Sequence, residues 1–125
     1  MSGVLVDTSV WIDHFRHSNT ALEVLLRQDL ACIHPIIVGE LACGTPPAPR
    51  SRTLRDLGLL PTIQHASLRE TMEFIERESL YGLGCGLVDL VLLTSTLLTP
   101  GAKLWTFDQR RAGLAARFDV AHQFP

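Results

Sequence analysis

Residues 4–12 read Val-Leu-Val-Asp-Thr-Ser-Val-Trp-Ile, and this stretch decides the fold. The three apolar residues before Asp7 include two β-branched ones, which is typical of a short buried strand. The two hydroxyl residues after Asp7 are good helix caps, so a helix is expected to follow and to run through Phe15. Asp7 therefore stands at the carboxyl end of a buried strand, the edge at which open α/β sheets bind ligands.

The rest of the chain alternates strands and helices in the same way. Pro35 suits the first turn of a helix and Gly44 its end, and Ser67 with Glu70 forms a capping box. Further helices are predicted from Thr20 and over 50–57, 86–98 and 112–117. Further strands are predicted over 31–33 and 104–107. Residues 60–63 are a weak strand or a loop, and residues 118–121 are an added edge strand. This order predicts one α/β domain over residues 1–125, built around a mainly parallel sheet.

Composition excludes several classes of protein. The chain has 125 residues, about the length of one domain, and with 46% hydrophobic and 19% charged residues it is not a disordered polymer. Its net charge of -2 disfavours a basic DNA-binding module. The three cysteines, Cys32, Cys43 and Cys85, form no CxxC pair and have apolar neighbours, so we expect buried, reduced thiols.

The sequence indicates neither a signal peptide nor a transmembrane helix. The start, Met1-Ser2-Gly3-Val4, lacks the basic and long apolar regions of a signal peptide. Residues 80–100 are apolar enough to need a membrane check, but three glycines interrupt the first half and Asp89 lies centrally, where a charge is costly in a bilayer. We expect a buried helix from Gly86 to Leu98 in a cytoplasmic protein.

Four acids have no ordinary place on a solvated surface. Asp7 and Asp108 each follow a predicted strand directly. Glu40 and Asp89 lie on apolar helix faces with no Arg or Lys in their local sequence, and burying an unpaired carboxylate costs several kcal/mol. The sequence must therefore compensate these charges in some way.

Two kinds of compensation are open. In the first, the acids act separately in helix caps or ion pairs, with Asp7 capping the helix after it and Asp108 capping one that begins near Gln109. In the second, all four share one site with Mg²⁺ or Mn²⁺, hard cations that take oxygen ligands. Shared carboxylates without a cation would repel, so the second alternative predicts that Asp89→Asn leaves the metal-free protein as stable or more stable.

At these acids the sequence resembles the PIN-domain nucleases, and within them the VapC-type toxins of bacterial toxin–antitoxin pairs. The resemblance lies in four stretches in register, at residues 6–12, 40–44, 86–93 and 104–108. It implies a three-layer sandwich with a central mainly parallel sheet flanked by helices, Mg²⁺ or Mn²⁺ in an acidic pocket, and endoribonuclease activity. Asp7, Glu40 and Asp89 match the three core acids, Asp108 matches a more variable fourth, and Thr8, Ser9 and Thr106 match pocket hydroxyls.

The resemblance also implies partners. These are an RNA substrate, a cognate antitoxin that places a basic side chain near the acids, and a second copy in a homodimer, with DNA reached only through the antitoxin. Two groups of arginines, Arg50, Arg52 and Arg55, and Arg110, Arg111 and Arg117, are candidates for phosphate contacts or for solvated helix faces. Without the nuclease activity, the alternatives are a non-catalytic PIN-like module that binds RNA or protein, and a Mg²⁺-dependent phosphoacceptor domain.

Overall fold

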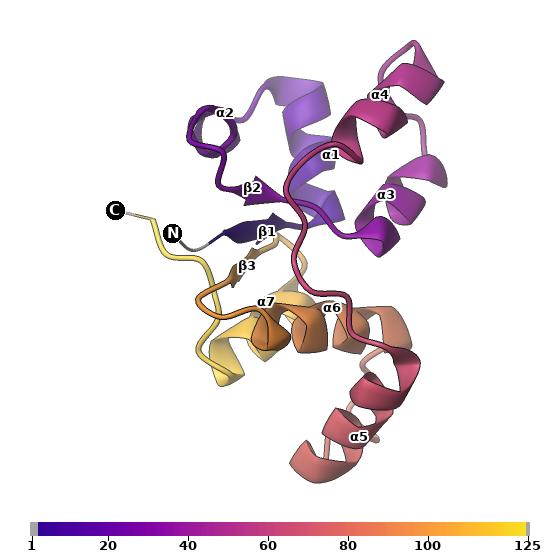
Figure 1. Ribbon diagram of the computed structural model, residues 1–125, viewed down its shortest axis with the longest axis vertical. Coiled ribbons are helices and arrows are strands. Elements are labelled where there is room, and N and C mark those ends of the chain that lie inside the picture. The colour runs from indigo at the N-terminus through magenta and orange to yellow at the C-terminus, as the bar shows by residue number, and fades with distance from the viewer. Residues whose placement is uncertain (1–2, 125) are drawn as a thin grey trace.

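A three-stranded parallel sheet forms the centre of the computed structural model, which describes residues 3–124 (Figure 1). The strand order is β2-β1-β3, and the strands span Ala31–Cys32, Val4–Val6 and Lys103–Trp105. In register, Leu5 lies between Cys32 on one side and Leu104 on the other. Three residues lie outside the described range. They are Met1 and Ser2, at the start of the stretch considered as a signal peptide, and Pro125, at the end of the predicted domain.

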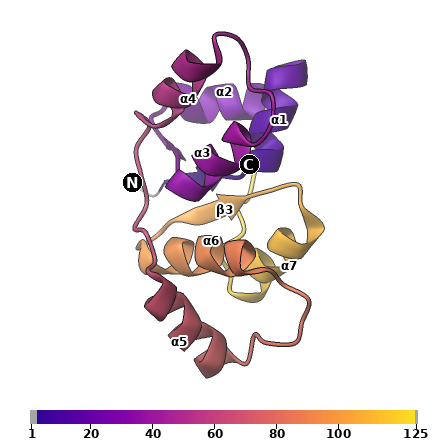
Figure 2. The same ribbon diagram turned by 90° about the vertical axis from the view of Figure 1, so that its right-hand side faces the viewer.

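Seven helices cover the two faces of the sheet within the described residues. They are α1 (Thr8–His17), α2 (Thr20–Arg27), α3 (Pro35–Ala42), α4 (Arg50–Leu57), α5 (Leu68–Glu78), α6 (Leu87–Leu98) and α7 (Gln109–Arg117). The helices α1 to α4 lie on one side of the strands, and α5 to α7 lie on the other (Figures 1 and 2). The predicted three-layer α/β sandwich with a parallel central sheet is confirmed.

The core is a single cluster of buried apolar side chains, to which α6 contributes Leu90, Leu92 and Leu93. Every residue from Leu90 to Thr96 is buried. The hydroxyls of Thr94 and Thr96 donate to carbonyl oxygens one turn earlier, at 2.7 and 2.8 Å, so the helix buries them without an unpaired polar group. The predicted buried helix is therefore confirmed, and no helix among residues 3–124 is long and apolar enough to cross a membrane.

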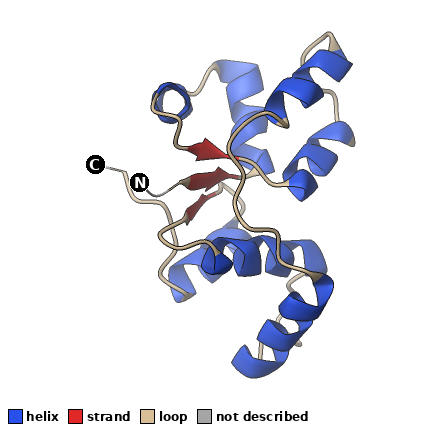
Figure 3. Cartoon of the chain, in the orientation of Figure 1, coloured by secondary structure: helices blue, strands red, loops and turns tan. Residues whose placement is uncertain are grey.

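The elements after residue 100 differ from their predicted bounds. The last strand ends at Trp105 rather than Phe107, and the last helix begins at Gln109 rather than at residue 112. Figure 3 shows how short the strands are beside the helices. The reason is the Asp108 carboxylate, which accepts a hydrogen bond from the Arg111 backbone N–H at 2.9 Å and so starts the helix early. The segments 60–63 and 118–121 contribute only single parallel bridges, Ile33 to Thr62 and Leu104 to Ala121.

The cysteines only partly match the prediction. All three are free thiols, but Cys32 alone is fully buried, while Cys85 is partly buried and Cys43 is exposed. Burial raises the pKa of the Cys32 thiol, which keeps it neutral. The prediction of a buried Cys43 is wrong because this residue lies at the carboxyl end of α3, where the chain turns toward solvent.

Candidate active site

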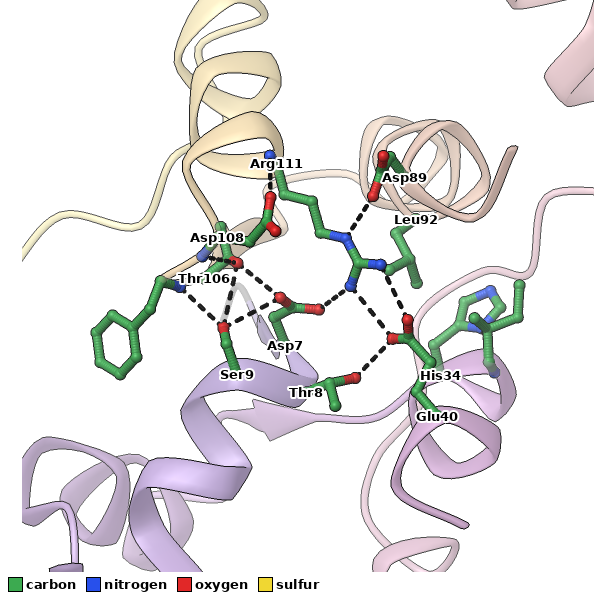
Figure 4. A network of polar contacts seen from close by, with 12 residues as sticks. Asp7, Thr8, Ser9, His34, Glu40, Asp89, Leu92, Thr106, Asp108 and Arg111 are labelled. Atoms are coloured by element: carbon green, nitrogen blue, oxygen red, sulfur yellow. Dashed lines mark hydrogen bonds and ion pairs between the residues drawn. The ribbon is translucent and has the colours of Figure 1, made fainter. Parts of the chain in front are cut away.

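Asp7 is the most deeply buried acid of the site. It leaves β1 at its carboxyl end, its side chain is 1% exposed, and its backbone N–H donates to the Trp105 carbonyl at 2.9 Å. The Thr106 hydroxyl donates to Asp7 Oδ2 at 2.6 Å and the Ser9 hydroxyl donates to the same oxygen at 3.2 Å (Figure 4). Two predicted pocket hydroxyls thus fix one oxygen of Asp7 and leave Oδ1 turned toward the centre of the site.

Glu40 reaches the site from the last turns of α3. The Thr8 hydroxyl donates to Glu40 Oε1 at 2.6 Å, which ties α3 to the start of α1. Burial by itself would raise the pKa of Glu40, but hydrogen bonds from Arg111 and Thr8 outweigh burial and hold this pKa below its ordinary value. Glu40 is therefore an anion oriented by its neighbours.

Asp89 enters from the opposite helical layer, in the first turn of α6. Its Oδ2 accepts the Gly86 backbone N–H at 3.0 Å, which caps the helix, and its Oδ1 faces Arg111. Burial would raise the pKa of Asp89, but the hydrogen bonds from Arg111 and Gly86 lower it below the ordinary value. The carboxylate thus combines a local capping role with a place in the shared site.

The guanidinium of Arg111 lies between these three acids (Figure 4). Its Nη1 donates to Asp7 Oδ1 at 2.6 Å and to Glu40 Oε1 at 3.2 Å, Nη2 donates to Glu40 Oε2 at 2.9 Å, and Nε donates to Asp89 Oδ1 at 2.6 Å. Its side chain is 12% exposed. Burial would lower the pKa of Arg111, but the hydrogen bonds to Glu40 and Asp89 raise it above the ordinary value, so the group is a permanent cation.

This arrangement corrects one prediction. The sequence-based expectation of unrelieved repulsion in the metal-free site is wrong, because Arg111 pairs with all three acids. Asp89→Asn would remove an ion pair of 2.6 Å, so the argument that this variant leaves the metal-free protein as stable or more stable no longer holds. The partner was missed because it is 71 residues from Glu40 and 22 from Asp89 in the chain.

A signal for Arg111 was nonetheless present in the sequence. A cation in the first turn of a helix faces the positive end of the helix dipole, which is an unfavourable place for it. Arg110 and Arg111 both follow the capping Asp108 in this turn, so the pattern favours a nearby anion but does not distinguish the two arginines. Arg50, from the other candidate group, donates to the Gly44 carbonyl at 3.0 Å and holds the end of α3.

Asp108 lies apart from the three other acids. It is exposed and caps α7 through the Arg111 backbone N–H, which agrees with the first alternative for this residue. Its own backbone N–H donates to the Thr106 hydroxyl at 3.0 Å, and Thr106 in turn donates to Asp7. No hydrogen bond or ion pair within residues 3–124 joins its carboxylate to Arg111's guanidinium.

A hollow of about 410 Å³ opens beside Glu40, between α1, α3 and the loop that follows α3. Arg16 contributes a positive charge to its wall, and Phe15 contributes an aromatic ring. The full lining is Ile12, Phe15, Arg16, Glu40, Leu41, Gly44, Thr45, Pro46 and Pro47. An elongated substrate held at the acids therefore has room to continue along α1.

The donor set suits a hard divalent cation. Three carboxylates and the hydroxyls of Thr8, Ser9 and Thr106 offer only oxygen, the ligand that Mg²⁺ and Mn²⁺ prefer. In the described part of the chain no three acidic, histidine or cysteine side chains are grouped closely enough to hold an ion directly. The acids instead surround the guanidinium of Arg111.

Comparisons with known proteins find a matching family model and similar curated sequences. Residues 4–116 match the family model described as "PIN domain", a range that includes Asp7, Glu40, Asp89 and Asp108. Two curated relatives, from the CDC 1551 and H37Rv strains of Mycobacterium tuberculosis, are both described as "Ribonuclease VapC32". Each is 39% identical over 123 residues, and the alignment covers 94% of this chain and 94% of the relative.

Proposed function

Since this chain belongs to the PIN-domain family, as a member of its VapC group, we propose that it is a Mg²⁺- or Mn²⁺-dependent endoribonuclease that acts as the toxin of a toxin–antitoxin pair. The observation that carries the proposal is the meeting of Asp7, Glu40 and Asp89 from three separate elements at one point. The three carboxylates outnumber the one guanidinium that pairs with them, so this partly buried centre keeps an excess of negative charge that a divalent cation would offset.

In this proposal the three acids are the catalytic residues, and they would hold the metal through their carboxylate oxygens. A bound divalent cation supplies an activated water and relieves charge on the departing oxygen of a phosphodiester. Thr106 and Ser9 orient Asp7, and Thr8 orients Glu40, through the hydrogen bonds that each hydroxyl donates. Asp108 is a peripheral member of the site.

The hollow beside Glu40 supports an RNA substrate. A strand whose phosphate lies at the acids would extend past Arg16, whose charge complements the next phosphate. Exposed Arg110 is a second candidate for such a contact. These features favour an RNA-binding PIN domain over a phosphoacceptor domain, and the cleavage assay separates a catalytic PIN domain from a non-catalytic one.

The decisive test is cleavage of single-stranded RNA by the purified protein, with Mg²⁺, with Mn²⁺ and with excess EDTA. We expect cleavage only with metal, and losses of more than about 100-fold in Asp7→Asn, Glu40→Gln and Asp89→Asn, since even outer-shell changes at metal sites cost 10–100-fold. The control is Glu73→Gln, which removes an acid from the exposed face of α5. Cleavage that persists in EDTA and in Asp7→Asn would refute the metal mechanism.

The partners belong to the same proposal. We propose a single cytoplasmic nuclease domain that forms a homodimer and is inhibited by a cognate antitoxin, through which alone it reaches DNA. Sedimentation equilibrium should give twice the 13.8 kDa mass of the chain, and co-expression with the product of the adjacent reading frame should give a larger complex without nuclease activity. A monomeric mass would contradict the homodimer. A product of the adjacent reading frame that neither copurifies nor inhibits would contradict the antitoxin.

A further inference from the structure

Every carboxylate oxygen at the centre of the site already has a hydrogen-bond donor. Arg111 donates to Asp7 Oδ1, to both oxygens of Glu40 and to Asp89 Oδ1. The remaining two oxygens accept from the hydroxyls of Thr106 and Ser9 and from the Gly86 backbone. The four oxygens that face the shared centre are therefore the four that bind the guanidinium.

The guanidinium and a divalent cation need the same place. Both would draw on the same carboxylate oxygens, and a monovalent and a divalent cation within one ligand shell would repel strongly in a partly buried site. Arg111 is 12% exposed in this position, so its side chain fills the centre of the site rather than its rim.

Arg111 is also able to leave. Its backbone stays fixed in the first turn of α7, where Asp108 caps it. Its long side chain has several rotatable bonds, so it can turn from the acids toward solvent while the helix stays unchanged. Release would also take the cation away from the buried wall of the pocket and return it to water.

We propose that Arg111 is an internal counter-ion, which occupies the acidic pocket in the metal-free protein and leaves it when a divalent cation binds. This inference rests on the proposed function only in that the pocket binds metal. In the metal-free protein, Arg111 is therefore neither a phosphate contact nor part of a solvated helix face, the two roles that the sequence suggested for it. Metal affinity is then set by competition between two cations for one group of acids.

The first test measures Mn²⁺ binding to the full chain by isothermal titration calorimetry, without RNA. Arg111→Gln removes the competing charge, and we expect it to bind Mn²⁺ at least tenfold more tightly than the parent. Arg110→Gln is the matched control, because it removes an equal charge from the next position without emptying the pocket, and a change of less than about threefold is expected. Arg111→Lys, which keeps a charge but not the planar fork, should fall between the two.

The second test follows Arg111 in the parent protein, so that it does not depend on the folding of any variant. In EDTA the Arg111 Nε–H, hydrogen-bonded to Asp89, should give a slowly exchanging NMR signal. Titration with Mg²⁺ should abolish this signal or move it to the position of a solvated guanidinium.

The outcomes separate the two proposals. Equal or weaker Mn²⁺ binding by Arg111→Gln, or an Nε–H signal unchanged at saturating Mg²⁺, would overturn the counter-ion role and leave the nuclease proposal standing. If neither the parent nor Arg111→Gln binds Mn²⁺, the pocket is not a metal site and both proposals fail.

Discussion

At the scale of single residues, the site depends on hydroxyls that fix buried acids. Asp7 is 1% exposed, and the energy of placing its charge there is offset by Arg111 on one oxygen and by Thr106 and Ser9 on the other. Charge-assisted hydrogen bonds of this kind contribute more than neutral ones. Thr106 is therefore expected to matter for stability as well as for activity.

Thr106→Val keeps the shape of the side chain and removes the donor to Asp7. We expect the free energy of unfolding in EDTA to fall by about 1.5–3 kcal/mol, the usual contribution of a hydrogen bond to a charged group, because Asp7 Oδ2 keeps only the longer bond from Ser9. Metal-dependent cleavage should fall with it, because Asp7 loses its orientation. Urea denaturation measures the first effect, and Thr106→Ser, which keeps the hydroxyl, is the matched control. Equal stability of the Val and Ser variants would contradict this role.

At the scale of elements, helix starts place the functional groups. The Asp108 carboxylate begins α7, so it decides where Arg111 leaves the helix. The His34 ring begins α3 in the same manner, since its Nδ1 accepts the Ile36 backbone N–H at 3.0 Å, and α3 carries Glu40. A change at Asp108 or at His34 should therefore alter the free energy of unfolding.

Replacements of Asp108 separate its capping role from a role in metal binding. Asp108→Ala should lower the free energy of unfolding by about 1 kcal/mol, whereas Asp108→Asn should retain stability, because Asn caps helices as well as Asp does. We expect Asp108→Asn to reduce RNA cleavage far less than Asp7→Asn, because the Asp108 carboxylate is exposed and does not touch Arg111's guanidinium. An Asn variant as unstable as the Ala variant would show that the cap is not the stabilising contact.

His34 makes the stability of the fold depend on pH. The ring is 3% exposed, and burial, together with the nearby His65, lowers its pKa from 6.5 to about 4. As the pH falls, His34 is protonated in the unfolded chain before it is protonated in the folded one. The stability that the neutral buried ring contributes is therefore complete above pH 6.5 and is lost as the pH falls from 6.5 toward 4. The slope for one such group is at most about 1.4 kcal/mol per pH unit.

His34→Asn should flatten this slope, because Asn can cap α3 but does not titrate. Urea denaturation between pH 6.5 and pH 4.5 measures the slope, to which His122, whose pKa burial also lowers, contributes equally in the parent and in the variant. His17→Asn, at an exposed position, is the control. A slope in His34→Asn equal to that of the parent would refute the assignment.

At the scale of the whole molecule, the site exists only when both helical layers are in place. Asp7 and Glu40 come from the side of α1 and α3, while Asp89 and Arg111 come from α6 and α7 on the other side of the sheet (Figure 1). A cation held by these acids binds only the folded chain, so it must stabilise the entire fold by mass action.

Thermal melts test this linkage. At Mg²⁺ a hundredfold above its Kd, the parent should gain about 2.7 kcal/mol, a rise in Tm on the order of 10 °C for a chain of this size. Asp7→Asn should gain much less, because a buried ligand is lost, whereas Glu73→Gln on α5 should gain as much as the parent. Equal gains in all three proteins would place the stabilising metal outside this pocket.

The sequence by itself determined the layered fold and the candidate acids. Strand and helix periodicity is local, and a carboxylate that directly follows a buried strand, as Asp7 does, is visible without any tertiary information. The burial of residues 90–96 in α6 likewise followed from an apolar run with a single charge near its start. These features depend on spacing along the chain, which the sequence states directly.

Only the tertiary structure decided which charge meets which. Arg111 reaches acids that are 104, 71 and 22 residues away, and Asp108 turns its carboxylate to a helix start rather than to the other acids. Ion pairs depend on distances of a few ångströms between side chains, and such distances are fixed by the packing of α3, α6 and α7 around the sheet, not by any local pattern. The sequence therefore predicted an acidic site, and the packing supplied the cation at its centre.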